Sequence, residues 1–173
     1  MQDTPESPEN RRPAKILVVE DEPLLNELLT MALKAEGWEV VSVAHGVDAL
    51  TAARNDRPDV AIVDVMIPGI DGVEVVRRLR ARGDDILVLF LTAKDTLDDK
   101  IAGLSVGGDD YVTKPFSLEE VMLRVRGMVD RRVGRTSHAN ADVLRVGDLS
   151  LDPDTYEVSR AGTPTSQYSQ ILI

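Results

Sequence analysis

The chain contains no cysteine, so it has neither disulfide bonds nor zinc or iron–sulfur sites built from thiolates. Aromatic residues make up only 3% of its 173 residues, and any core must therefore be mainly aliphatic. No apolar run approaches the ~20 residues of a membrane-spanning helix, and residues 1–15 lack the apolar segment of a signal peptide. These absences predict a soluble, cytoplasmic protein.

Positive charge is also scarce, because 20 Lys and Arg residues face 30 Asp and Glu residues, and the formal net charge is −10. Such a balance argues against nonspecific binding of the whole chain to nucleic acid or to an anionic membrane. Hydrophobic residues nevertheless reach 43%, which is enough for a proper core. The length suggests one domain with an appendage, since domains commonly run to about 100–150 residues.

Strand and helix patterns alternate along most of the chain. Strands are predicted at residues 15–19, 39–44, 60–63, 86–91 and 111–113. Helices are predicted after each of them, at residues 25–35, 46–55, 73–82, 97–104 and 118–129. This alternation predicts a parallel sheet with helices on both faces, in the doubly wound, flavodoxin-like α/β class with strand order 2-1-3-4-5.

Polar residues stand at the carboxyl ends of four of these strands: Glu20, Asp21, Asp64, Thr92 and Lys114. In the order 2-1-3-4-5 the first and third strands are neighbours, so Glu20, Asp21 and Asp64 should converge on one crevice. Clustered carboxylates repel one another unless a cation compensates them, and oxygen ligands with open positions suit Mg²⁺. A lysine opposite them can neutralise a phosphoryl group, and a threonine hydroxyl can hydrogen-bond it. The crevice is predicted to place a phosphate on a carboxylate.

Asp64 alone has two interpretations, because an aspartate before turn-forming residues can also simply begin a loop. The order and spacing of the surrounding motifs decide between them. These motifs are Glu20-Asp21, Asp64 with Pro68-Gly69-Ile70-Asp71-Gly72, Thr92-Ala93, and Tyr111-Val112-Thr113-Lys114-Pro115-Phe116. Together they resemble the receiver domain of two-component response regulators, over about residues 15–132. The resemblance implies that Asp64 accepts a phosphoryl group from the phosphohistidine of a sensor histidine kinase.

The resemblance also implies a metal site around Asp64. Asp21, Asp64 and the Met66 backbone carbonyl would bind Mg²⁺, with Glu20 acting through water. A receiver of this kind is not expected to be an enzyme, beyond self-phosphorylation from small donors and self-dephosphorylation.

Three further residues receive roles from the same resemblance. Lys114 would contact the phosphoryl group, Thr92 would swing toward it, and Tyr111 would follow inward as the switch. The Lys114–Pro115 bond is a candidate cis peptide, as X–Pro bonds can be.

A second set of charged residues looks like that of the OmpR-type subgroup: Lys100, Asp109, Asp110, Glu120, Arg124 and Arg131. Regulators of this subgroup form homodimers through the fourth helix, fifth strand and fifth helix when phosphorylated, so this set is the expected dimer face. On spacing alone, an ordinary solvated helix face is the stronger interpretation of Glu120, Arg124 and Arg131. Gly108 stands where these regulators usually have alanine, which loosens a turn without touching the chemistry.

Composition assigns the remaining segments. Residues 1–14 are typical of a disordered leader, and residues 133–143 of a flexible linker. Residues 144–173 hold short strand patterns and are similar to the small antiparallel sheet that precedes the winged-helix DNA-binding domain of OmpR-type regulators. Residues 165–173 do not resemble the helix start that should follow, so we expect an incomplete effector domain, from truncation, a frameshift or fragmentation. Promoter DNA is then a partner of the intact family member and not of this chain.

The predicted function is a transcriptional regulator that is switched by phosphorylation in a two-component phosphorelay. A stand-alone, receiver-like phosphate acceptor is one alternative, and a phosphohydrolase with an aspartyl nucleophile on a related scaffold is another. Hydrolases of the haloacid-dehalogenase type usually carry a second aspartate two residues after the nucleophile, as general acid. Met66 occupies that position here, which favours the switch.

Overall fold

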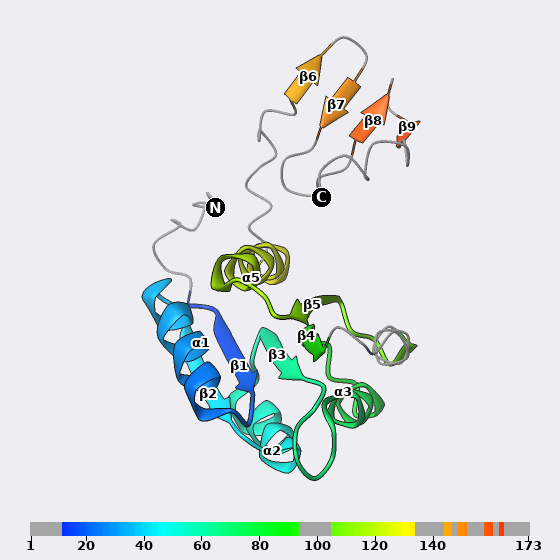
Figure 1. Ribbon diagram of the computed structural model, residues 1–173. Coiled ribbons are helices and arrows are strands. Elements are labelled where there is room, and N and C mark those ends of the chain that lie inside the picture. The colour runs from blue at the N-terminus through cyan, green and yellow to red at the C-terminus, as the bar shows by residue number, and fades with distance from the viewer. Residues whose placement is uncertain are drawn as a thin grey trace, which may run out of the picture. The chain divides into compact units, whose positions relative to one another are not determined.

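The computed structural model describes residues 12–93 and 105–133 in full, and the backbone of residues 144–146, 149–151, 158–160 and 163–164. The chain divides into two compact units, Met1–Val133 and Gly134–Ile173. In the first unit, five parallel strands form one sheet in the order β2-β1-β3-β4-β5 (Figure 1). The predicted doubly wound α/β fold is therefore confirmed.

The elements of this unit agree with the predicted ones to within a few residues. The strands are β1 (Lys15–Val19), β2 (Glu39–Val43), β3 (Val60–Asp64), β4 (Leu87–Ala93) and β5 (Asp110–Lys114). The helices are α1 (Pro23–Ala35), α2 (Gly46–Asp56), α3 (Gly72–Ala81) and α5 (Leu118–Arg132). The helix predicted at residues 97–104 lies outside the described residues.

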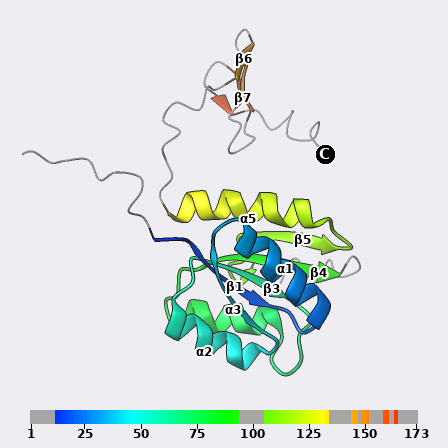
Figure 2. The ribbon, with the colours of Figure 1, turned by 90° about the vertical axis from the view of Figure 1, so that its left-hand side faces the viewer.

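Helices cover both faces of the sheet, with α1 and α5 on one face and α2 and α3 on the other (Figure 2). Successive side chains of a strand point to opposite faces. In β1, Ile16 and Val18 accordingly pack with α1 and α5, whereas Leu17 and Val19 pack with α2 and α3. The central strand β3 is buried at every position, which explains its wholly apolar run before the terminal aspartate.

The register of the strands sets the position of the polar residues that follow them. Val19 of β1 pairs with Val63 of β3, so the next residues, Glu20 and Asp64, follow side by side at the carboxyl edge of the sheet. On the other side, Ala93 of β4 pairs with Lys114 of β5 at the same edge. The parallel topology thus gathers at one edge the residues that lie far apart in the sequence.

Residues 12–14, the last residues of the predicted leader, are among the described residues. Ala14 is buried, and its carbonyl accepts a hydrogen bond from the Glu39 N–H at 2.9 Å. Arg12 donates two hydrogen bonds, of 2.9 and 2.8 Å, to the Asp59 carboxylate. Backbone and ionic contacts therefore hold residues 12–14 at the start of the sheet.

The second unit contains an antiparallel sheet of four short strands in the order β6-β7-β8-β9. The strands are β6 (Leu144–Val146), β7 (Leu149–Leu151), β8 (Val158–Arg160) and β9 (Thr163–Pro164). Residues 134–143, which include most of the predicted linker, lie outside the described residues. In the described part of the chain, no helix is long and apolar enough to cross a membrane.

Candidate functional site

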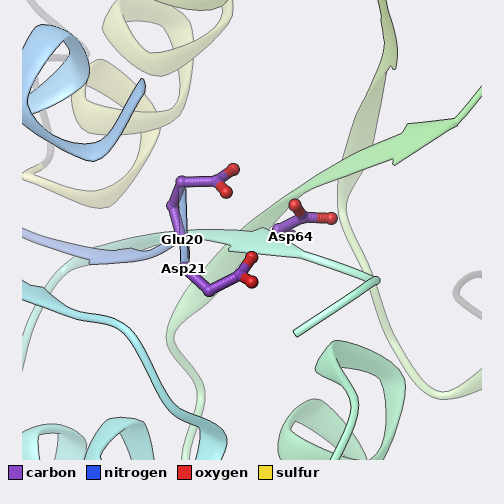
Figure 3. Close-up of side chains that lie close together, drawn as sticks. All are labelled: Glu20, Asp21 and Asp64. Carbon is purple, nitrogen blue, oxygen red and sulfur yellow. The ribbon is translucent and has the colours of Figure 1, made fainter. Parts of the chain in front are cut away.

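Three carboxylates from the ends of β1 and β3 lie close together (Figure 3). One oxygen from each of Glu20, Asp21 and Asp64 lies within 4.8 Å of the others. Glu20 and Asp64 are almost fully buried, at 1% and 4% exposure, whereas Asp21 faces solvent. The structure thus brings together the three acids that the strand order predicted.

Lys114, at the end of β5, reaches the two buried acids. Its Nζ atom lies 2.7 Å from Asp64 Oδ2 and 3.1 Å from Glu20 Oε2. Burial raises the pKa of the Glu20 carboxyl and the Asp64 charge adds to this, against the lowering effects of the Glu22 N–H and the Lys114 ammonium. Burial also lowers the pKa of Lys114, but its contacts with Asp64 and Glu20 outweigh burial and raise that pKa. The charged ammonium therefore compensates the buried carboxylates.

Backbone groups hold the two buried carboxylates in place. Asp64 Oδ1 accepts a hydrogen bond of 2.9 Å from the Met66 N–H, and Glu20 Oε1 accepts one of 3.0 Å from the Glu22 N–H. The Asn26 amide, in α1, donates to the Glu20 carbonyl at 2.9 Å, which fixes the turn that carries the acids. Asn26 was not predicted, because a polar residue in an amphipathic helix has no feature that separates it from a solvated one.

Glycines shape the loop between β3 and α3. The Gly72 N–H donates to the Val65 carbonyl at 3.0 Å, and a Cβ atom on Gly72 would lie 2.2 Å from the Asp64 carbonyl oxygen. Gly69 has a φ of +84°, which favours glycine, and Asp71 caps α3 by accepting a hydrogen bond from the Glu74 N–H. The turn-forming sequence therefore folds the loop back onto Asp64.

Thr92 and Tyr111 lie on β4 and β5. Thr92 is 1% exposed, and its hydroxyl donates to the Ala93 carbonyl at 3.2 Å. The Tyr111 side chain packs against the core under α2 and α3, and its hydroxyl is buried with no hydrogen-bond partner among the described residues. Burial raises the pKa of this phenol. The Lys114–Pro115 peptide is cis, as the resemblance implied.

Only some residues of the predicted dimer face contact one another in the described part of the chain. Arg124 of α5 contacts Asp110 at 2.9 and 3.1 Å and Glu120 at 3.3 Å. Arg131 is exposed near the end of the same helix. Lys100 lies outside the described residues. Within the described part, Arg124 is therefore the centre of this charged group.

Asp109 does not join Arg124. Its Oδ2 atom accepts a hydrogen bond of 2.7 Å from the Val88 N–H and lies 3.4 Å from the Arg80 guanidinium. Arg80, in α3, also donates to the carbonyls of Ile86 and Gly107, each at 2.8 Å. Asp109 and Arg80 thus tie α3 to the segment that precedes β5, a connection that the sequence did not indicate.

A hollow of about 570 Å³ lies at the amino ends of the strands. Five arginines and three aspartates line it: Arg12, Arg54, Arg57, Arg82, Arg132, Asp59, Asp84 and Asp85. Each aspartate pairs with an arginine, and α2, α3 and α5 all end there. The three pairs leave Arg54 and Arg57, a formal excess of two positive charges, and the partial negative charge of the helix carboxyl ends offsets this excess in part.

The first unit matches a known family. The model of the response regulator receiver domain matches residues 16–126. The "Probable transcriptional regulatory protein TcrX" of Mycobacterium tuberculosis is 52% identical over 155 residues, which cover 90% of this chain and 66% of that protein. The response regulator MprA of Mycolicibacterium vanbaalenii is 42% identical over 154 residues, which cover 89% of this chain and 67% of that protein. The chain spans less than two thirds of the length of TcrX.

One solved structure with a similar fold holds a metal ion. The receiver domain of the sensor histidine kinase PA1611 from Pseudomonas aeruginosa PAO1 is 30% identical, with a TM-score of 0.61 over 71% of this chain and 99% of that chain. That structure has a magnesium ion coordinated in the active site cleft. Motifs, strand order, acidic cluster and matched family model agree, and the chain belongs to the family of response regulator receiver domains.

Proposed function

We propose that Asp64 is the phosphoacceptor of a two-component response regulator that controls transcription. One observation carries this proposal: the buried Asp64 carboxylate lies between two further acids and one lysine at the carboxyl edge of the sheet. In the transfer, an Asp64 oxygen attacks the phosphorus of a phosphohistidine, the P–O bond forms and the P–N bond breaks. The imidazole leaves with the bonding electron pair, and the acyl phosphate remains on Asp64.

The donor set fits Mg²⁺. Asp21 and Asp64 offer hard oxygen ligands beside Glu20. The resemblance adds the Met66 carbonyl as a further ligand and lets Glu20 act through water, and few protein ligands suit an ion that keeps several waters. A bound Mg²⁺ would supply positive charge to the phosphoryl oxygens. Lys114 already holds a positive charge against Asp64, and it can pass its hydrogen bond to an incoming phosphoryl oxygen.

Labelling with a small phosphodonor tests the acceptor. With acetyl phosphate and Mg²⁺, the chain should gain one acid-labile, hydroxylamine-sensitive phosphate, and Asp64→Asn should abolish it. Asp71→Asn is the matched control, because Asp71 lies on the same loop and an asparagine keeps its capping hydrogen bond. Full labelling of the Asp64 variant would refute the assignment.

A sensor histidine kinase is the proposed physiological donor. Leu24, Leu28 and Met31 of α1 are 73%, 47% and 63% exposed, and their spacing places them in one stripe on the helix that begins after the acids. This stripe suits the apolar surface of a donor protein. Leu28→Asp should slow transfer from a kinase that labels the wild-type chain by about tenfold, and leave labelling by acetyl phosphate unchanged. Equal losses with both donors would contradict docking at this face.

Phosphorylation is proposed to act through Thr92 and Tyr111 and to promote a homodimer through the face around Arg124. The choice of this face rests on the charge pattern of the sequence, and Arg124 lies at the centre of its described part, in contact with Asp110 and Glu120. Sedimentation velocity tests it: the phosphorylated chain should form dimers, and Arg124→Glu should remain monomeric although it is still phosphorylated. Monomers in both samples would remove the dimer from the proposal.

The second unit is proposed to be the start of a winged-helix effector domain, joined by a linker at residues 133–143. The antiparallel β6–β9 sheet and the names of the transcriptional relatives support this. A cytoplasmic location follows from the same proposal. A phosphohydrolase gains no support, because position 66 presents a methionine side chain that is 67% exposed instead of a carboxylic acid.

A further inference from the structure

Gly46, the first residue of α2, packs directly on the loop between β3 and α3. A Cβ atom built on Gly46 would lie 2.5 Å from Ile70 Cγ1, 2.6 Å from the Ile70 carbonyl oxygen and 2.8 Å from Val75 Cγ2. Cβ atoms essentially never lie within 3.0 Å of such atoms. Because one of the three atoms belongs to the backbone, the rotation of a side chain cannot relieve the overlap.

The need for glycine at position 46 comes from this contact and not from the backbone angles. Gly46 has helical backbone, whereas the glycines with positive φ among the described residues are Gly37, Gly69, Gly83 and Gly107. Within a helix, glycine is less favourable than alanine. The close approach of α2 to the loop therefore explains a residue that helix propensity disfavours.

Gly72, the first residue of α3, contacts the end of β3, where the loop at residues 65–71 begins. As described above, a side chain on Gly72 would overlap the Asp64 carbonyl, and its N–H binds the Val65 carbonyl. Gly46 of α2 thus contacts the loop near its end, at Ile70, and Gly72 of α3 binds the loop at its first residue, Val65. The same loop carries Met66, whose N–H donates to Asp64 Oδ1.

We propose that Gly46 is a positioning residue for the cation site, which acts by holding the loop at residues 65–71 in place. The inference rests on the proposed function in one respect, the assignment of the Met66 carbonyl as a Mg²⁺ ligand. Gly46 itself touches neither the acids nor a phosphoryl group. A methyl group at position 46 pushes on the Ile70 carbonyl, and the displacement reaches Met66 through four intervening peptide bonds.

Two glycine-to-alanine variants form a matched pair. Gly46→Ala inserts the overlapping methyl group, whereas Gly127→Ala inserts a methyl group into α5 where no heavy atom of the described residues lies within 4 Å. Mg²⁺ binding is measured by calorimetry without a phosphodonor, and amide hydrogen exchange of residues 65–71 is measured in the metal-free protein. Gly46→Ala should bind Mg²⁺ about tenfold more weakly and exchange faster in the loop, as expected when an outer-shell contact of a metal site is lost. Gly127→Ala should match the wild type in both.

Labelling by acetyl phosphate separates positioning from general damage. Saturating Mg²⁺ should restore the labelling rate of Gly46→Ala, because Asp64 itself is unchanged. If wild-type protein binds no Mg²⁺, the proposed function fails. If wild-type protein binds it and Gly46→Ala binds it equally, with unchanged loop exchange, only the role of Gly46 is overturned.

A second variant keeps the proposal testable if Gly46→Ala does not fold. Ile70→Ala removes a side-chain atom that packs on Gly46 and inserts nothing, so the fold should tolerate it better. The loosened contact should speed exchange at residues 65–71 and weaken Mg²⁺ binding, by less than Gly46→Ala. Unchanged exchange and affinity in Ile70→Ala would equally overturn the proposal.

Discussion

Replacing Lys114 with methionine removes the positive charge that the two buried acids share. Methionine is similarly long and flexible, so the change mainly removes charge. In the metal-free protein, Glu20 and Asp64 then lie buried without a cation, and removal of one partner of a buried ion pair costs about 3–5 kcal/mol. The Lys114 side chain is 29% exposed, so solvent screens part of this interaction. We expect the free energy of unfolding at neutral pH to fall by about 2 kcal/mol.

The loss should depend on pH through Glu20. Burial raises the pKa of Glu20 above its ordinary value of 4.5, so the folded protein binds this proton more readily than the unfolded chain. Glu20 therefore lowers the free energy of unfolding as the pH rises from 4.5, its ordinary pKa, through its higher pKa in the folded protein. Lys114 opposes the rise, so the pKa of Glu20 should be higher still in Lys114→Met. The stability difference between the two proteins should be larger at about pH 7.5 than at about pH 5.

Urea unfolding in the presence of a chelator measures this difference at both pH values. Added Mg²⁺ should stabilise Lys114→Met more than the wild type, because a divalent cation replaces the missing ammonium. Lys15→Met is the control, since Lys15 begins the same sheet but pairs only with the exposed Glu39 carboxylate, at 3.4 Å. If Lys114→Met matches the wild type at pH 7.5 without metal, Lys114 does not compensate the acids and the reasoning is wrong.

Three other variants test features away from the crevice, Arg57→Gly and Arg80→Leu by urea unfolding and Arg12→Gln by acid unfolding. Arg57, which follows the last residue of α2, has a φ of 49°, a conformation that costs a non-glycine residue about 1–2 kcal/mol. Glycine adopts this conformation freely but loses more conformational entropy on folding, so Arg57→Gly should stabilise the protein by about 0.5–1 kcal/mol. Burial favours a higher pKa of Asp59, but the hydrogen bonds from Arg12 and from the Lys15 N–H outweigh burial and lower that pKa. Asp59 therefore stabilises the fold above its ordinary pKa of 3.8, and this stabilisation is lost as the pH falls through the pKa of the folded state. Arg12→Gln should therefore unfold at higher pH on acidification, and unchanged acid unfolding would contradict this. Arg80→Leu should cost about 2 kcal/mol, because it leaves buried carbonyls without their donor, and a loss near zero would show that water replaces the guanidinium.

The sequence predicted the acidic crevice because two strong rules combine there. Apolar runs locate the strands, and parallel topology places all carboxyl ends at one edge. Once the strand order is assumed, Glu20, Asp21 and Asp64 must meet, and Lys114 must lie at the same edge. The structure brings all four residues together, as expected. What they do there stays a prediction that the labelling experiment tests.

Other contacts could not be predicted from the sequence, because they join side chains to partners that are distant in the sequence. The Arg12–Asp59 pair joins the predicted leader to the start of β3, and no local pattern marks either residue. Arg80 belongs to a helix rich in arginine, where spacing alone indicates a solvated face, yet it binds the Gly107 carbonyl. The contact between Gly46 and the loop is equally invisible, because glycine at a helix start has many ordinary explanations. Packing, which single-sequence patterns do not encode, decides each case.

The charges of the predicted dimer face are already paired within one chain. Arg124 contacts Asp110 at 2.9 Å and Glu120 at 3.3 Å. If the proposed dimer exchanges these contacts for equivalent ones across the interface, the net ionic contribution to its formation would be small. Leu123, which is 53% exposed on α5, presents apolar surface to solvent, and its burial in a dimer would favour association. If the proposed phosphorylation of Asp64 favours the dimer-forming conformation by a few kcal/mol, it would shift the equilibrium from monomer to dimer without any net gain from these ionic contacts.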